Sequence, residues 1–234
     1  MEERKHIVIL AAGDFPTHDV PQKALRDADF IVCCDSAYAH LRDNETTRPE
    51  DPDVSTSRRL DVLSSFVVIG DGDSLSDVDK AALGEHWIHV AEQDYNDLHK
   101  AMQWAVAKFG ILDSQFTILG ATGRREDHTL GNISYLVTFA EEYPGADITM
   151  LTDYGTFRAL AAGEYCLPCF PRQQISLFAP DPATRLYSRG LRWPLDGNQP
   201  KRWWQATLNE ALEDNFTLRC SGWVILFSTF EPKG

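Results

Sequence analysis

The chain has 234 residues, of which 43% are hydrophobic, and a formal net charge of -13. This length is enough to bury a substantial core, as one large domain or two small ones. The negative charge would repel nucleic acids and acidic membrane surfaces, so we expect neither as a partner. No apolar stretch approaches the length of a membrane span, and the charged opening residues lead straight into a strand-like run. The expected location is therefore cytoplasmic.

Short apolar runs alternate with helical patterns up to about residue 153. The runs, rich in Val, Ile and Phe, cover residues 6–12, 30–35, 66–70, 87–90, 116–120 and 148–152. The clearest helical pattern covers residues 95–109, with one apolar face formed by Leu98, Met102, Ala105 and Phe109. A second helical pattern begins near Asp127 and is expected to turn inward Leu130, Ile133, Leu136 and Val137. This alternation predicts an α/β domain over residues 1–153 with a mainly parallel, Rossmann-like sheet.

The pattern changes after Asp153, where short runs are broken by Pro, Gly and Asp. Residues 174–178, 218–220 and 223–227 have the composition of strands, and no long helical pattern recurs. We therefore predict an all-β, sandwich-like domain over residues 154–234. The polar stretch of residues 43–61 has no periodicity and is expected to form a long surface loop.

An acidic turn, Asp71-Gly-Asp73-Ser74, follows the apolar run of residues 66–70. The turn would bring Asp71 and Asp73 to the carboxyl end of a strand, where open α/β sheets bind ligands. Oxygen ligands at this spacing suit Mg²⁺ that carries a nucleotide. The alternative is a polar loop in which Ser74 and Asp77 cap the next helix.

A second acidic segment, residues 92–97, follows the run at 87–90 and opens the clearest helix. Asp94 and Asp97 are three residues apart, so in a first helical turn their carboxylates lie on nearly the same face. They could complete a metal site with the first acidic turn. The alternative is a capping arrangement, since acids favour the amino end of a helix.

A glycine-containing segment, residues 120–128, follows the apolar run of residues 116–120. The order of strand, glycine turn and helix places backbone N–H groups against phosphate, and the guanidinium of Arg125 could grip phosphoryl oxygens bidentately. His128 and Asn132 share a face of the following helix, where Gly131 suggests a close neighbour. The alternative is a solvated loop with His128 hydrogen-bonded between the domains.

Five segments resemble, in order, motifs of the thiamine pyrophosphokinase family. Residues 35–37 look like its Asp-Gly-Gly-Ala, residues 71–74 like its Gly-Asp-Phe-Asp-Ser, and residues 93–97 like its Gln-Asp-x-Thr-Asp. Residues 120–132 are similar to its Gly-x-x-Gly-Gly-Arg-x-Asp-His-x-x-x-Asn, and residues 184–195 to its Thr-x-x-Gly-Leu-x-Trp-Pro-Leu. Residues 207–210 match its Ser-x-Ser-Asn-Glu only in part. The chain departs from the family pattern at Gly72 (usually phenylalanine), Arg124 (usually glycine) and Leu208 (usually serine).

The resemblance implies an α/β catalytic domain, a β-sandwich domain that helps bind thiamine, and a homodimer. It implies transfer of the terminal diphosphoryl group of ATP to thiamine, leaving AMP, with Mg²⁺ as cofactor. The implied Mg²⁺ ligands are Asp71, Asp73, Asp94 and Asp97. The implied catalytic residues are Asp71, Asp73, Asp97, Arg125 and Asp127. The implied nucleotide-binding residues are Asp35, Ser74, Gly123, Arg125, His128 and Asn132. The implied thiamine-binding residues are Gln93, Asp94, Thr207 and Asn209. One of four tryptophans could add cation–π attraction while the others lie in the core: Trp193, Trp203, Trp204 and Trp223.

Two other functions would use the same residues. A metal-dependent nucleotide or diphosphate hydrolase would release phosphate or AMP without an acceptor alcohol. A non-catalytic sensor of thiamine or nucleotide would bind its ligand without turnover. The acidic residues argue against a sensor, because simple binding of a cationic ligand needs no metal ligands.

Overall fold

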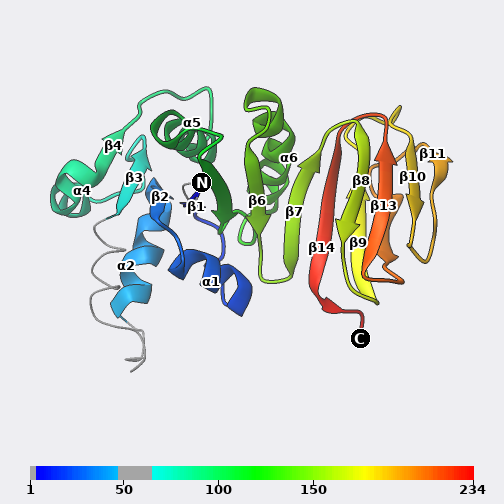
Figure 1. Ribbon diagram of the computed structural model, residues 1–234. Helices are drawn as coiled ribbons and strands as arrows, with labels where there is room; N and C mark the ends of the chain where they lie inside the picture. Colours follow the sequence, from blue (N-terminus) through cyan, green and yellow to red (C-terminus); the bar gives the residue numbers. More distant parts are fainter. Residues whose placement is uncertain (1–3, 47–64) are drawn as a thin grey trace. The chain divides into compact units, whose positions relative to one another are not determined.

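The computed structural model describes residues 4–46 and 65–234 (Figure 1). The described residues divide into two compact units, one within the ranges 1–135 and 145–147 and the other within 136–144 and 148–234. Within the two described ranges, no helix is both long enough and apolar enough to cross a membrane.

The first unit is an α/β structure whose strands lie in the order β5-β1-β2-β3-β4, with every neighbouring pair parallel. The strands are β1 (Lys5–Leu10), β2 (Phe30–Cys34), β3 (Phe66–Gly70), β4 (Trp87–His89) and β5 (Ser114–Leu119). Residues 7–10 of β1 are fully buried, as expected for a parallel strand covered on both faces. The predicted apolar runs in this unit all form strands.

Parallel pairing brings the carboxyl ends of these strands to the same edge of the sheet. Strand β1 lies between β2 and β5, so the chain continues from β1 to one side and returns to β5 on the other. Ligands of open α/β sheets bind outside the carboxyl ends of strands, next to such a change of direction. The acidic turn after β3 and the glycine loop after β5 therefore lie at the edge that a ligand would use.

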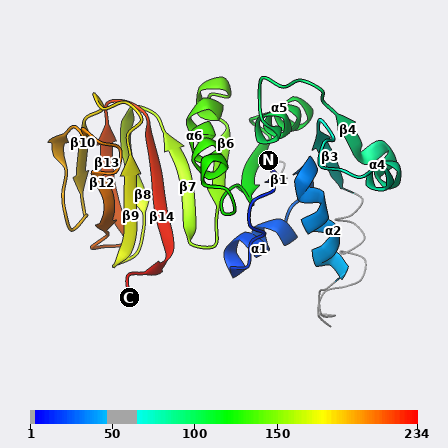
Figure 2. The same ribbon diagram turned by 180° about the vertical axis from the view of Figure 1, so that it is seen from behind.

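Among the described residues, one α-helix follows each of these five strands (Figure 2). The helices are α1 (Asp19–Arg26), α2 (Tyr38–Thr46), α4 (Asp77–Leu83), α5 (Asp97–Phe109) and α6 (Glu126–Glu142), with short 3₁₀ turns at η1 (Asp35–Ala37) and η2 (Gly84–His86). Helix α2 corrects part of the loop expected at residues 43–61, because its last four residues are 43–46. The rest of that predicted loop lies outside the described residues.

Helix α5 confirms the clearest helical pattern. It packs against β1, β2 and β3 and buries the predicted Leu98, Met102 and Ala105. The helix begins at Asp97, two residues later than predicted, because the side chain of Asn96 caps it by accepting a hydrogen bond from the His99 N–H at 3.0 Å.

Helix α6 confirms the second helical pattern and corrects two of its details. Leu136 is buried as predicted, but Leu130 is 54% exposed. The buried side chains are those of Asn132, Leu136 and Phe139, which are spaced four and three residues apart and so lie on one face of the helix. Gly131 has no described atom within 4 Å of the place where a Cβ would lie, so the neighbour expected there is absent among the described residues.

The second unit is rich in antiparallel strands. One set has the order β12-β9-β14-β7-β6 and the other the order β11-β10-β13-β8. Their bounds are β6 (Asp147–Leu151), β7 (Gly155–Leu160), β8 (Gly163–Pro168), β9 (Gln173–Phe178), β10 (Leu186–Arg189), β11 (Asp196–Asn198), β12 (Ala206–Glu210), β13 (Asn215–Cys220) and β14 (Val224–Pro232). The predicted strands at 174–178 and 218–220 fall within β9 and β13, and the one at 223–227 falls within β14 except for Trp223, since β14 begins at Val224.

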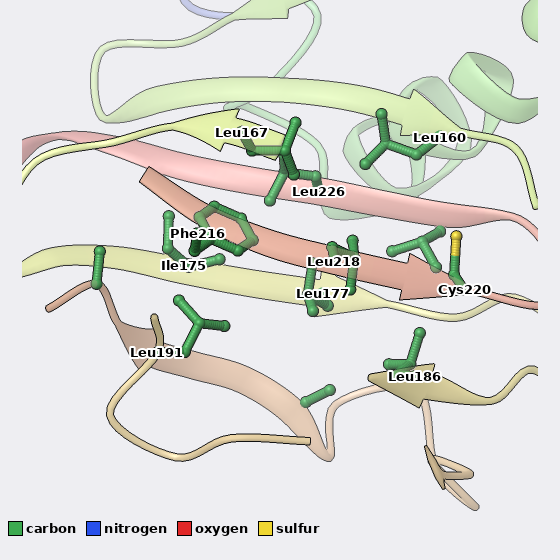
Figure 3. Close-up of a cluster of buried hydrophobic side chains, with 13 residues drawn as sticks. Leu160, Leu167, Ile175, Leu177, Leu186, Leu191, Phe216, Leu218, Cys220 and Leu226 are labelled. Carbon is green, nitrogen blue, oxygen red and sulfur yellow. The ribbon is translucent and has the colours of Figure 1, made fainter. Parts of the chain in front are cut away.

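Side chains from both sets of strands form one hydrophobic cluster, in which Ile175, Leu186 and Leu218 are fully buried. Figure 3 shows leucines of β7, β9, β13 and β14 among its members. Each fully buried leucine or isoleucine contributes about 1.5–3 kcal/mol relative to an exposed one. This cluster gives the second unit a core of its own.

Candidate functional site

The acidic turn after β3 holds Asp71 by two hydrogen bonds. Its Oδ1 accepts from the Asp73 N–H at 3.0 Å, and its Oδ2 accepts from the Gln93 side-chain amide at 2.9 Å. These bonds, the first above all, lower the pKa of Asp71. The residue that caps α4 is Ser76, so the alternative of a cap at Ser74 does not hold. The structure therefore brings together a fixed, ionised Asp71 and the predicted Gln93.

Asp35 lies beneath this turn and is only 1% exposed. Its Oδ2 accepts a hydrogen bond from the Gly72 N–H at 3.0 Å. The backbone of Gly70 passes so close that a Cβ there would lie 2.6 Å from the Cβ of Asp35, and Gly72 has φ of 82°. The Asp35 Oδ1 has no hydrogen-bond partner among the described residues. Asp35 thus holds the acidic turn in place.

Asp97 opens α5 and lies next to Lys100. The Lys100 Nζ is 3.4 Å from the Asp97 Oδ1, and the lysine side chain is only 4% exposed. Burial raises the pKa of Asp97, Lys100 opposes this rise, and the carboxylates of Asp35 and Asp71 add to it. Three carboxylates and one buried ammonium therefore lie within electrostatic reach of one another.

Asp94 occupies a different environment from Asp97. Its side chain is exposed, and its backbone N–H is bonded to the Glu92 carboxylate. The cap of α5 is Asn96, so the proposed capping arrangement of Asp94 with Asp97 is wrong. In the described structure Asp94 is on the approach to the helix rather than inside the cluster of Asp35, Asp71 and Asp97.

The glycine loop after β5 lies tightly against the residues that follow β1. Ala11 N donates to Leu119 O at 2.8 Å, and Asp14 N donates to Thr122 O at 2.8 Å. Gly123 has φ of 80° and lies against the carboxylate of Asp14, so a Cβ has no space there. Arg124, which stands where the family pattern has glycine, also has a positive φ of 57°. The backbone here keeps the left-handed conformation that favours glycine.

Arg125 and Asp127 form an exposed bidentate ion pair. The Arg125 Nε donates to Asp127 Oδ1 at 3.1 Å, and its Nη2 donates to Asp127 Oδ2 at 2.5 Å. The Arg125 hydrogen bond is the main reason that the pKa of Asp127 falls to about 2. His128 is exposed, and its backbone N–H donates to Asp127 Oδ1 at 2.9 Å. Asp127 thus fixes the guanidinium plane at the start of α6, while Arg125 remains open to solvent.

Two residues of this unit, Lys100 and Asn96, were not among the predicted site residues, and the predicted Asn132 has an unexpected role. Lys100 was not predicted, although a lysine three residues after Asp97 in an apolar helix face was the available signal. Asn96 was not predicted, although an asparagine before a helix is a common cap. The predicted Asn132 is 8% exposed, and its amide bonds are to Asn96 and to the Ala121 carbonyl.

The predicted residues of the second unit bind its own backbone. The Thr207 Oγ1 donates to the Trp204 carbonyl at 2.7 Å. Asn209 is 6% exposed, and its amide accepts from Trp193 N at 3.1 Å and donates to Trp193 O at 2.7 Å. These side chains therefore fix the loops that carry two tryptophans.

Three tryptophans of the second unit, Trp193, Trp203 and Trp204, are more than half exposed. Two of them border an open cavity of roughly 300 Å³. The cavity is lined by Ala179, Pro180, Pro182, Pro200, Lys201, Arg202, Trp203 and Trp204. Exposed indole faces of this kind can stack on a cationic aromatic ligand.

The donor set of the first unit fits Mg²⁺. Among the described residues, no three histidine, cysteine or acidic side chains are gathered closely enough to hold a metal ion by themselves. Mg²⁺ usually binds through one or two carboxylates together with waters and substrate phosphates, so a closed protein cage is not required. Asp71, whose pKa is lowered, and Asp97 supply carboxylate oxygens of the kind that Mg²⁺ prefers, and the nearby Asp35 Oδ1 has no hydrogen-bond partner among the described residues.

Two family models match the chain. "Thiamin pyrophosphokinase, catalytic domain" matches residues 21–150, which is more than half of the chain. "Thiamin pyrophosphokinase, substrate-binding domain" matches residues 155–227. The order of the two matches is the order of the two units.

Curated relatives match over parts of their length. The chain is 31% identical over 81 residues to Thiamin pyrophosphokinase 1 of Caenorhabditis elegans, a match that covers 32% of this chain and 32% of the relative. It is 29% identical over 134 residues to thiamine pyrophosphokinase of Bacillus subtilis (strain 168), covering 54% of this chain and 60% of the relative. The matched region therefore spans less than two thirds of each relative.

Solved structures resemble the chain over nearly its whole length. Thiamin pyrophosphokinase from Candida albicans has a TM-score of 0.76 at 20% identity, with 97% of this chain and 90% of that chain covered. A thiamin pyrophosphokinase family protein from Enterococcus faecalis has a TM-score of 0.72 at 22% identity, with 97% and 100% covered. These likenesses show a shared fold.

Proposed function

Because the chain belongs to the thiamin pyrophosphokinase family, we propose that it transfers the terminal diphosphoryl group of ATP to the hydroxyethyl oxygen of thiamine. The products are thiamine diphosphate and AMP. The observation that carries the proposal is the match of both domain models, on a chain whose first unit holds ionised Asp71 beside Asp97 and Asp35. The acidic cluster and the Arg125–Asp127 pair supply the two kinds of group that diphosphoryl transfer needs.

We assign the metal to the carboxylates of the first unit. Asp71 and Asp97 bind Mg²⁺ directly or through water, and the exposed Asp73 and Asp94 add oxygens from the edge of the site. Bound Mg²⁺ neutralises charge on the phosphates of ATP. Asp35 acts through the turn that it holds, since its Oδ2 bonds the Gly72 N–H.

The phosphates of ATP are assigned to the amino end of α6. Arg125 is exposed and presented in a fixed plane by Asp127, so it can grip phosphoryl oxygens while Asp127 orients it. His128, Ser74 and the backbone at Gly123 complete the nucleotide site. Asn132 contributes by holding the loop that it bonds.

Contacts with thiamine are assigned within each unit separately. The side-chain amide of Gln93, which is held by Asp71, bonds the substrate, and Asp94 attracts its positive charge. Thr207 and Asn209 shape the loops that carry Trp204 and Trp193. No strong base is required, because in a loose transition state the proton of the alcohol leaves late and one aspartate near the hydroxyl suffices.

Several finer features belong to the same proposal. The second unit is a β-sandwich, supported by its hydrophobic cluster of side chains from both sets of strands. The domain boundary lies between residues 153 and 154, supported by the gap between the two matched ranges. The active form is a homodimer, and the protein acts in the cytoplasm, as the family resemblance and the composition suggest.

The test is to incubate the purified chain with Mg²⁺ and ATP, with and without thiamine, and to quantify AMP and thiamine diphosphate by chromatography. We expect equal amounts of both products, only with thiamine present, and none after chelation of Mg²⁺. AMP without thiamine diphosphate would instead indicate a hydrolase, and neither product would indicate a binding protein.

An Asp73→Asn variant separates catalysis from folding in the same assay. The Asp73 side chain is exposed, and the hydrogen bond that shapes the turn comes from its backbone N–H. We therefore expect most turnover to be lost while the unfolding temperature stays within about 2 °C of wild type, since surface substitutions usually change stability by less than 0.5 kcal/mol. Loss of stability in proportion to loss of activity would contradict the metal role.

A further inference from the structure

Two asparagines form a chain of hydrogen bonds across the first unit. The Asn96 Oδ1 accepts from the His99 N–H at 3.0 Å, and its Nδ2 donates to the Asn132 Oδ1 at 3.1 Å. The Asn132 Nδ2 then donates to the Ala121 carbonyl at 2.8 Å. This chain of bonds connects the start of α5, the second turn of α6 and the loop after β5.

The direction of each bond is fixed by its ends. A backbone N–H at one end requires the Asn96 oxygen, which leaves the Asn96 NH₂ group to face α6. A backbone carbonyl at the other end requires the Asn132 NH₂ group, which leaves the Asn132 oxygen to face α5. Turning either amide would place two donors or two acceptors together, so only this arrangement satisfies both side chains.

The segments that these hydrogen bonds join carry the two halves of the proposed site. Asn96 directly precedes Asp97, while Ala121 lies in the loop that leads to Arg125. We infer that Asn96 and Asn132 are positioning residues, which hold the metal-binding carboxylate of Asp97 in register with the phosphate-gripping loop. This inference rests on the proposed function, because it assumes that one ligand, MgATP, is held by both halves.

The bridge, meaning the hydrogen bond from Asn96 to Asn132, needs an amide at both positions. A serine or threonine hydroxyl at position 96 can cap a helix but has no NH₂ group to reach Asn132. Asn132 is 8% exposed, so water is a poor substitute partner for its oxygen if Asn96 is replaced. The alternative is that Asn96 acts only as the cap of α5, and the experiment must distinguish this role from its bond to Asn132.

Asn96→Ser separates the two roles. Serine caps a helix as well as asparagine does and is uncharged, but it is too short to bridge. Asn132→Ala removes the same bond from the other side, and the double variant completes a thermodynamic cycle. Ser134→Ala, on the same helix but outside the bridge, is the matched control.

Two readouts are needed for each variant. The first is kcat/KM for MgATP in the transfer assay. The second is the affinity for Mg²⁺ with α,β-methylene-ATP, measured by titration calorimetry, since this analogue cannot break its α–β linkage. We expect each single variant to lose about fivefold in both quantities, the value of one ordinary hydrogen bond, and the double variant to lose no more than Asn132→Ala alone. Asn96→Ser should also unfold about 2–12 °C below wild type, because its cap remains but the nearly buried Asn132 oxygen loses its donor. In the Asn132→Ala background it should cost no further stability.

Three results would overturn the inference: wild-type affinity in Asn96→Ser, losses that multiply in the double variant, or equal losses in Ser134→Ala. If the wild type makes no thiamine diphosphate, the proposed function fails, yet the calorimetric cycle still decides whether the bridge holds a nucleotide site. If the wild type binds no analogue at all, both proposals fail.

Discussion

Replacing Asp35 tests whether a buried carboxylate holds the acidic turn. Asp35→Ala removes the acceptor of the Gly72 N–H, a bond of 3.0 Å at a residue that is 1% exposed. Leaving a buried donor unpaired costs about 1–3 kcal/mol. For a chain of this length each kcal/mol lowers the unfolding temperature by about 2–4 °C, so we expect a decrease of about 2–12 °C.

Asp35→Asn is the matched variant, because its amide oxygen can still accept from the Gly72 N–H. We expect it to unfold within about 2 °C of wild type and to keep more turnover than Asp35→Ala, since the turn that carries Asp71 stays in place. A displacement of about 1 Å at a reacting group can cost about a hundredfold in rate, so Asp35→Ala should lose at least tenfold in kcat.

Circular dichroism melting curves and the chromatographic assay measure the two quantities. The reasoning would be refuted if Asp35→Ala melted at the wild-type temperature. It would also be refuted if Asp35→Asn were as unstable as Asp35→Ala, because the charge rather than the hydrogen bond would then carry the effect.

Three further predictions concern the same unit. Gly120→Ala should destabilise the protein by about 2 kcal/mol or more, because φ is 63° and a Cβ would collide with backbone, whereas Gly131→Ala should stabilise it by about 0.5–1 kcal/mol in urea unfolding. Lys100→Met should move the acid limb of the kcat/KM profile to higher pH, because Lys100 lowers the pKa of Asp97 and its removal lets burial raise that pKa further. Arg125→Lys should lower kcat/KM for MgATP about tenfold or more in steady-state kinetics, because an ammonium cannot bind phosphoryl oxygens bidentately.

Each of these has a contrary result. Equal stability of the two alanine variants would show that backbone conformation at the glycine loop is unimportant. An unmoved acid limb in Lys100→Met would mean that Asp97 does not control it, and Asp127 is no substitute, since its pKa of about 2 lies below the assay range. Wild-type kinetics in Arg125→Lys would mean that Arg125 acts only through its positive charge and not by bidentate binding.

The strands and the positions of the motifs were predictable because their signals are local. Runs such as residues 66–70 are apolar on both faces, and the glycine beside Asp71 marks the end of the strand. The family motifs were recognisable, in their order along the chain, from equally local segments. Helix faces were less predictable: Leu130 has the right spacing for burial in α6 but is exposed, since the neighbours of a helix decide which of its faces is covered.

The sequence by itself determined that an α/β unit precedes a β-rich unit and that two acidic segments and a glycine loop follow strands. Only the tertiary structure decided which groups meet: Asp35 with Gly72, 37 residues away, and Asn96 with Asn132, 36 residues away. It also decided that Asn96 rather than Asp94 caps α5, and that Lys100 lies buried beside Asp97. The physical reason is that strand and turn signals reside in neighbouring residues, whereas hydrogen-bond partners and burial depend on how distant segments pair and pack.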